Sequence, residues 1–220
     1  AKTRKIDDYT AVIELTGLKP DTEYLYTLTV DDKAVAPLET LQFRTFPARS
    51  RAAKFTIAFG GGAGYTPWNE HMWTTIGKRK PLAMLLLGDN VYVDMPTVRQ
   101  TQRYCYYRRQ SRPEFRTLMA QTPVFAIYDD HDFGINDCVP GPDIDTPAWK
   151  RPVWKLFTEN WANPYYGGGE KQPGCWFDFQ IGDVDFIMLD GRYYRTKPKL
   201  GAKSSMLGPA QKKWLYAKLK

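Results

Sequence analysis

Histidine and cysteine are scarce in this chain of 220 residues, which contains two of the first and three of the second. The cysteines stand at positions 105, 138 and 175, too far apart for a CxxC zinc pair and too few for a disulfide-dense scaffold. One disulfide with a free thiol and three buried thiols both remain open. No apolar run approaches the ~20 residues of a membrane span, and the opening Ala1-Lys2-Thr3-Arg4 has no apolar stretch, so the sequence shows no signal peptide.

The composition is that of a folded, basic protein. Hydrophobic residues make up 43% and charged residues 25%, which excludes a disordered or collagenous chain, and aromatic residues reach 15%. The net charge of +7 suits anionic partners such as phosphate esters. Because the positive charge is scattered in short clusters, such as 78–80 and 108–109, nucleic-acid binding is not favoured.

The first 48 residues are predicted to be β-structure. Residues 11–15, 24–30 and 41–45 are rich in apolar, aromatic or β-branched residues. The segment 17–24 between the first two resembles the corner of fibronectin type III domains, in which a tyrosine hydroxyl, here that of Tyr24, bonds back to the backbone. Only three or four strands fit, so we expect a partial domain that the chain enters part-way through.

From residue 54 the pattern changes to strands alternating with helices, which is typical of a layered α/β domain. The strands and helices that we expect are listed here by residue number: strands 54–59, 82–87 and 123–128, a hairpin of 177–180 with 184–189, and helices 68–76, 98–119 and 207–219.

Three of these apolar strands end in carboxylates, namely Asp89, Asp130 and Asp190. The ends of neighbouring parallel strands lie close together, and converging carboxylates repel one another unless a cation or protons neutralise them. Hard divalent ions prefer such oxygen ligands. His131 directly follows Asp130, where it could contact a substrate oxygen or protonate a leaving group. The sequence therefore predicts a metal cluster at these strand ends.

Four motifs, in order, resemble those of the alkaline phosphatase D (PhoD-like) family of metallophosphoesterases. Residues 88–92 match its GDxxY motif, 128–137 its DDH motif with the following Asn, 189–195 its LDxR motif, and 206–215 its LG…Q…WL helix. The resemblance implies a calcineurin-like β-sandwich of two mixed sheets flanked by helices, in an extracytoplasmic enzyme. It also implies hydrolysis of phosphate mono- or diesters by a metal-activated hydroxide at an iron and calcium centre.

The resemblance also implies a role for each motif residue. Asp89 would bridge the metals, Tyr92 would bind iron as a phenolate, and Asp130 would bind the second metal and take part in catalysis. His131 would face the phosphoryl oxygens as a catalytic residue. Two further residues are expected to bind substrate: Arg192 and Asn136. For Arg192 a structural ion pair with Asp190 is the competing interpretation.

The sequence departs from the family pattern in two places. Gly62 stands where the family usually has an iron-binding cysteine, so iron binding is in question. The family's late histidine motifs follow the LG…Q…WL helix, whereas this sequence stops at Lys220, so we expect the phosphatase domain at 54–220 to be incomplete. These departures leave an alternative open: a catalytically inactive binding or surface module on the phosphatase scaffold.

Overall fold

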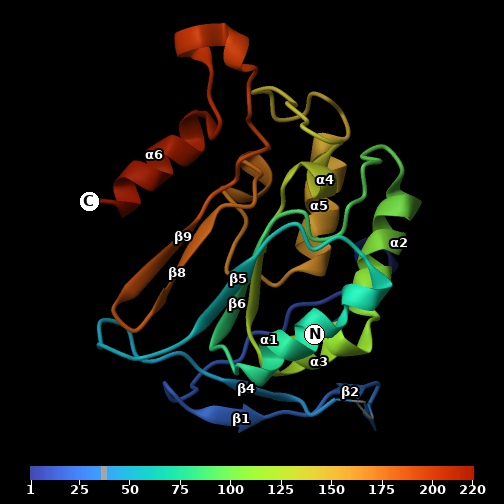
Figure 1. The fold of residues 1–220 in the computed structure, drawn as a ribbon, viewed down its shortest axis with the longest axis vertical. Helices are drawn as coiled ribbons and strands as arrows, with labels where there is room; N and C mark the ends of the chain where they lie inside the picture. Colours follow the sequence, from blue (N-terminus) through green and yellow to red (C-terminus); the bar gives the residue numbers. More distant parts are fainter. Residues whose placement is uncertain (36–38) are drawn as a thin grey trace.

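Three parallel strands form the centre of the structure, which is a computed structural model describing residues 1–35 and 39–220 (Figure 1). They are β5 (Ile57–Gly60), β6 (Ala83–Leu87) and β7 (Val124–Ile127), with β6 in the middle. Each connection between them carries helices, as parallel strands require. All three lie where the sequence predicts strands, so the α/β class is confirmed.

The helices depart from the sequence prediction in two respects. The expected single helix 98–119 is two, because Arg112 precedes a proline and takes an extended conformation there. The sequence pattern predicts no helix at 150–160, yet one forms there and supplies much of the buried aromatic core. The helices are α1 (His71–Lys78), α2 (Arg99–Gln110), α3 (Pro113–Gln121), α4 (Asp130–Phe133), α5 (Lys150–Asn160) and α6 (Gly208–Lys218), with short 3-10 turns η1 (Lys5–Asp7), η2 (Pro67–Asn69), η3 (Gly169–Lys171) and η4 (Pro198–Lys203).

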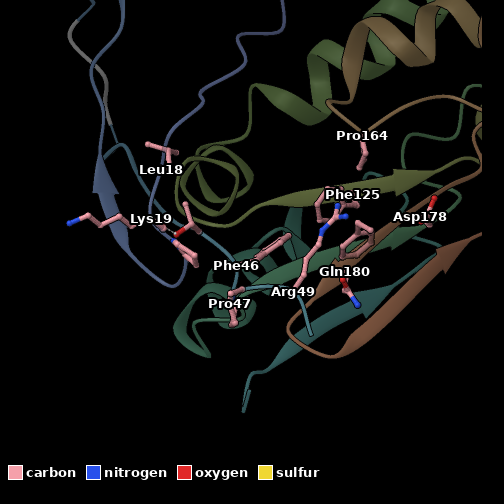
Figure 2. A pocket seen from close by; sticks show the side chains of 13 residues that line it. Leu18, Lys19, Phe46, Pro47, Arg49, Phe125, Pro164, Asp178 and Gln180 are labelled. Carbon is pink, nitrogen blue, oxygen red and sulfur yellow. Dashed lines mark hydrogen bonds between the residues drawn. The ribbon is translucent and has the colours of Figure 1, made fainter. Parts of the chain in front are cut away.

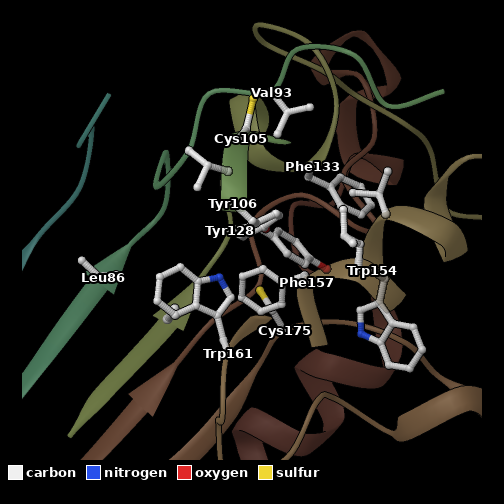
Figure 3. Packing of buried hydrophobic residues seen from close by; sticks show 14 of the residues in the cluster. Leu86, Val93, Cys105, Tyr106, Tyr128, Phe133, Trp154, Phe157, Trp161 and Cys175 are labelled. Carbon is white, nitrogen blue, oxygen red and sulfur yellow. The ribbon is translucent and has the colours of Figure 1, made fainter. Parts of the chain in front are cut away.

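Strand β6 is buried on both faces, which explains its uninterrupted run of apolar residues. Met84 and Leu86 belong to the core shared with the helices, and Ala83 and Leu85 to a second core on the opposite face. Figure 3 shows the first core, in which the rings of the residues around β7 and α5 interdigitate. The sheet thus separates two apolar layers.

An antiparallel hairpin, β8 (Phe177–Ile181) and β9 (Val184–Met188), builds the second core. The ring of Phe179 stacks on Phe125 of β7 at 4.2 Å and on Phe186 of β9 at 4.8 Å between ring centroids. The hairpin is the one that the sequence predicts. In the described residues its sheet is purely antiparallel and the central sheet purely parallel, so neither is mixed as the resemblance implied.

The N-terminal segment contains two short antiparallel ribbons. Strand β1 (Glu23–Leu25) pairs with β4 (Gln42–Arg44), and β2 (Thr29–Val30) with β3 (Lys33–Ala34). The predicted strand 11–15 is wrong: these residues lie in no ladder of the described chain, and Val12 and Ile13 are exposed. The Lys19 N–H does donate to the Tyr24 hydroxyl at 2.9 Å, which is the expected corner contact.

The type III assignment itself stays a prediction, and residues 36–38 of that segment lie outside the described residues.

A shallow hollow lies between the N-terminal segment and the central domain (Figure 2). Lys19 and Phe46 line it from the N-terminal side, and Phe125 and Phe179 from the core.

All three cysteines are buried free thiols, which decides between the two possibilities left open above. Among the described residues, no helix combines the length and the hydrophobicity needed to cross a membrane.

Candidate metal centre

The ends of β6 and β7 bring together three of the predicted site residues. Asp89 follows β6, whereas Asp130 and His131 begin α4 just after β7. One oxygen of each carboxylate and one ring nitrogen of His131 all lie within 4.8 Å of one another. Two acids and a histidine at this separation form a possible cation site at the carboxyl edge of a parallel sheet.

Gly88 allows the two loops to approach so closely. A Cβ at this position would lie 2.5 Å from the Cβ of Asp129, closer than any real contact. Its φ of +106° is also a conformation that other residues avoid. The glycine of the GD pair is therefore required by the contact between the loops after β6 and β7.

The loop that carries Asp89 is strained. Asp89, Tyr92 and Asp94 have φ of +54°, +49° and +53°, in the left-handed region that residues with a side chain rarely adopt. Backbone strain of this kind persists only where the surroundings enforce it, and it concentrates at functional sites.

Asp132 supplies much of that enforcement. Its buried carboxylate accepts hydrogen bonds from the N–H groups of Asn90 at 3.0 Å and Val91 at 2.8 Å, and from the Asn90 side chain at 3.1 Å. Burial raises its pKa to about 7 against the opposing effect of these donors. Asp132 thus ties the Asp89 loop to α4, a role that no feature of the sequence predicts.

Asp89 is the least satisfied acid of the site. Burial, followed by the charges of Asp130 and Asp129, raises the pKa of its carboxyl. Its Oδ1 is buried and has no hydrogen-bond partner, and its Oδ2 lies 3.5 Å from the Tyr92 hydroxyl. A buried carboxylate oxygen without a partner is costly, and a cation would satisfy it. The residues present therefore fit a bound divalent metal.

Asp130 is held in place as an anion. Its Oδ2 accepts the N–H of Asp137 at 2.5 Å, and its Oδ1 lies 3.2 Å from Nη2 of Arg192. Burial by itself would raise the pKa of Asp130, but these two partners outweigh it and the pKa is lowered. Arg192 also donates from Nε to Asp129, so its side chain pairs with the DDH motif. The alternative ion pair of Arg192 with Asp190 is wrong.

His131 is oriented by Asp94 and Tyr92. Its Nδ1 lies 2.7 Å from Oδ1 of Asp94, and its ring stacks on that of Tyr92 with centroids 4.3 Å apart. Burial alone would lower the pKa of His131, but the hydrogen bond and charge of Asp94, with the charges of Asp89 and Asp130, raise it. Asp94 is a site residue that sequence reasoning missed, because nothing in its spacing marks it.

Three other sequence expectations have different outcomes. Asn136 is exposed and donates to the side chain of Asp137, beside the turn that holds Asp130. Asp190 does not join the cluster: it is turned into the core, where it accepts the Tyr128 hydroxyl at 2.5 Å. Gly62 faces the site, since a Cβ there would lie 3.8 Å from the Tyr92 hydroxyl oxygen, but it offers no ligand atom.

Known proteins resemble this chain in sequence family and in fold. The family model described as PhoD-like phosphatase matches residues 57–220. A solved structure titled "Structure of PhoD" superposes with a TM-score of 0.80 at 19% identity, over 99% of this chain and 48% of that one, so this chain spans about half its length. A purple acid phosphatase from yellow lupin (Lupinus luteus) seeds matches with a TM-score of 0.54 at 12% identity, over 79% of this chain and 31% of that one. No curated protein sequence matches.

Proposed function

Because the chain belongs to the PhoD-like phosphatase family, we propose that it hydrolyses phosphate esters at the centre formed by Asp89, Asp130 and His131. The observation that carries this proposal is the buried, unpartnered Oδ1 of Asp89 within a cluster of two carboxylates and a histidine. A structural site would satisfy that oxygen with a donor. Here two of the neighbouring residues, Asp129 and Asp130, carry carboxylates, as expected of residues that share a cation.

The oxygen-rich ligand set suits a hard cation. Asp89 and Asp130 would hold it through carboxylate oxygens, and the Tyr92 hydroxyl lies close enough to Asp89 to join them. Calcium matches these donors, whereas iron would depend on the Tyr92 phenolate because Gly62 supplies no thiolate. When bound, such an ion neutralises phosphoryl oxygens and lowers the pKa of water.

His131 is proposed as the general acid. Asp94 occupies Nδ1 and raises the pKa of the ring, so that Nε2 is left to donate a proton to the leaving oxygen. The stacked ring of Tyr92 fixes the plane in which that nitrogen points. Proton donation at this position would increase the rate without contributing to metal affinity.

The substrate would be a phosphate ester, bound with the help of Arg192 and Asn136. Nε of Arg192 contacts Asp129 and Nη2 contacts Asp130, so the guanidinium holds a positive charge beside these carboxylates. Asn136 is exposed on the same loop as the turn that holds Asp130, where its amide can reach an incoming group.

Three variants test these roles. We expect Asp89→Asn and Tyr92→Phe to reduce bound metal, because one loses the bridging charge and the other its oxygen. We expect His131→Ala to keep its metal but to lose ~10²–10⁴-fold in rate. Metal content by elemental analysis and steady-state hydrolysis of a chromogenic phosphodiester separate the two effects.

His71→Ala is the matched control, since His71 is the other histidine of the chain and is exposed on α1. It should change neither readout. Equal metal loss in His131→Ala and Asp89→Asn would make His131 a ligand and overturn its role as the acid. Metal binding by the unaltered chain without any hydrolysis would favour the inactive binding module, an alternative that the glycine at position 62 supports.

A further inference from the structure

Arg109, in the last turn of α2, carries a buried positive charge that the proposed chemistry does not use. Its side chain is 2% exposed and its partner Glu70 1%. Nη1 of Arg109 lies 2.7 Å from both carboxylate oxygens of Glu70, and the Trp73 indole N–H also donates to Glu70 at 3.0 Å. The pair is therefore fully hydrogen-bonded inside the protein.

The same guanidinium reaches both loops that border the candidate metal centre. Nη2 donates to the carbonyl of Ala63, in the glycine-rich loop after β5. Nε lies 3.4 Å from the carbonyl of Asn90, the residue after Asp89. The two loops meet at Tyr92, because a Cβ at Gly64 would lie 3.4 Å from its ring. One side chain from a helix thus connects the two strand-end loops.

The peptide groups around Asn90 are held from opposite sides. Asp132 of α4 accepts the N–H of Asn90, and Arg109 of α2 donates toward its carbonyl. A buried ion pair often adds little net stability compared with apolar residues of the same size. What a guanidinium adds is a rigid, planar set of donors that fixes several acceptors relative to one another.

We propose that Arg109 is a positioning residue for the metal centre, which sets the spacing between the glycine-rich loop 60–64 and the Asp89 loop. Glu70 holds the guanidinium in the orientation that reaches both carbonyls. The inference rests on the proposed function in one respect, namely that the loops it positions hold a cation. Arg109 itself contacts neither substrate nor metal.

A second arginine on the same helix, whose side chain is 36% exposed, provides a control for the loss of an arginine–glutamate pair. Arg99, at the start of α2, donates from Nη2 to both oxygens of Glu159 on α5 at 3.0 Å. This ion pair joins two helices, and none of its hydrogen bonds reaches the loops of the site. Arg109→Met and Arg99→Met therefore each remove one arginine–glutamate pair from α2. Only the first removes a side-chain link between the loops, which the backbone hydrogen bond from the Gly62 N–H to the Gly88 carbonyl at 3.1 Å also joins.

The test combines hydrogen exchange with titration by Mn²⁺. In Arg109→Met we expect faster amide exchange in both 60–65 and 88–94, and binding of Mn²⁺ at least tenfold weaker than in the wild type. In Arg99→Met we expect neither change. Arg109→Lys keeps the charge for Glu70 but lacks the planar fork, so it should fold and still show the faster exchange.

Two results would overturn the inference. One is exchange in both loops that stays at the wild-type rate in Arg109→Met and Arg109→Lys. The other is an equal change in Arg99→Met, which would show a general loss of stability. If the wild type and Asp89→Asn bind Mn²⁺ equally, the proposed function is wrong, and the exchange rates alone still decide whether Arg109 spaces the loops.

Discussion

Two acids of this protein follow apolar strands and have opposite surroundings. Asp190, after β9, accepts hydrogen bonds from the Tyr128 hydroxyl and from three backbone N–H groups, those of residues 175, 192 and 193. Its backbone also exchanges two hydrogen bonds with the side chain of Gln211 on α6. Asp89, after β6, has a buried oxygen without any donor and two anionic neighbours.

The difference separates a structural carboxylate from a candidate metal ligand. Asp190 is 1% exposed, yet every contact described above is one that the fold itself supplies, and the residue joins β9 to α6. The buried Oδ1 of Asp89, in contrast, accepts no hydrogen bond from the protein. In this chain, an acid at a strand end becomes a candidate ligand when its neighbours include other acids and one of its buried oxygens has no hydrogen-bond donor.

The largest expected effect comes from replacing Asp190. Asp190→Asn places an amide group among four donors, so we expect the free energy of unfolding to fall by about 3–4 kcal/mol. Asp89→Asn, measured in metal-free buffer, should change it by less than about 1 kcal/mol, because the charge that it removes is one that the neighbouring carboxylates repel. Urea denaturation of both variants makes the comparison. Equal losses would show that the two acids do not differ in kind.

Gly88→Ala should have the next largest effect. The added Cβ meets Asp129, and the φ of +106° disfavours alanine, so we expect a loss of about 2–3 kcal/mol in unfolding free energy. Because the substitution separates the two ligand loops, Mn²⁺ binding should weaken even in the fraction that remains folded. Gly141→Ala is the control, since that glycine also has a positive φ, of +93°, but no atom within 4 Å of the added carbon. Unchanged metal affinity in Gly88→Ala would contradict the requirement for close approach.

Asp94→Asn should change catalysis without changing the fold. Asp94 raises the pKa of His131, so its loss lowers that pKa and moves the basic limb of the rate profile to lower pH. We expect kcat to fall about tenfold with KM unchanged. Steady-state kinetics across pH measures both. A drop in rate with an unshifted profile would show that Asp94 does not act through the imidazole.

The smallest expected effect is on the pH dependence of stability, and it comes from Lys150, at the start of α5. Its buried ammonium donates to the carbonyls of Gly141 and Asp143 and lies 4.5 Å from the Tyr193 ring centroid. Burial lowers its pKa to about 8, from an ordinary 10.5. Between these values the unfolded chain binds the proton and the folded chain does not, so wild-type stability should increase with pH in that window.

The comparison for that prediction is Lys150→Met, which has no such proton to lose. Urea unfolding of both proteins at several pH values between 8 and 10 should show the wild type gaining stability relative to the variant. Other titrating groups are common to both and cancel in the difference. Parallel curves would mean that the amine keeps its ordinary pKa in the fold.

The α/β class, the three central strands, the hairpin and the convergence of Asp89, Asp130 and His131 could all be predicted from the sequence. This is because apolar runs of strand length record burial, and because parallel strands must end at a common edge. Prediction failed for residues 11–15, whose apolar pattern finds no partner strand in the described chain, and for 150–160, where the helical pattern was not recognised.

Which acids lack hydrogen-bond donors depends on tertiary packing, and the sequence does not predict it. Asp190 and Asp89 look alike in sequence, since each follows an apolar run and precedes a polar turn. Their difference depends on the donors that reach each carboxylate. Asp190 accepts two N–H groups of its own turn and, from distant segments, the Cys175 N–H and the Tyr128 hydroxyl, whereas Oδ1 of Asp89 accepts none. The same holds for Asp94 on His131 and for Arg109 between two loops, because these contacts join residues 37 and 19 or more positions apart. Spacing along the chain carries no record of such encounters, and packing alone creates them.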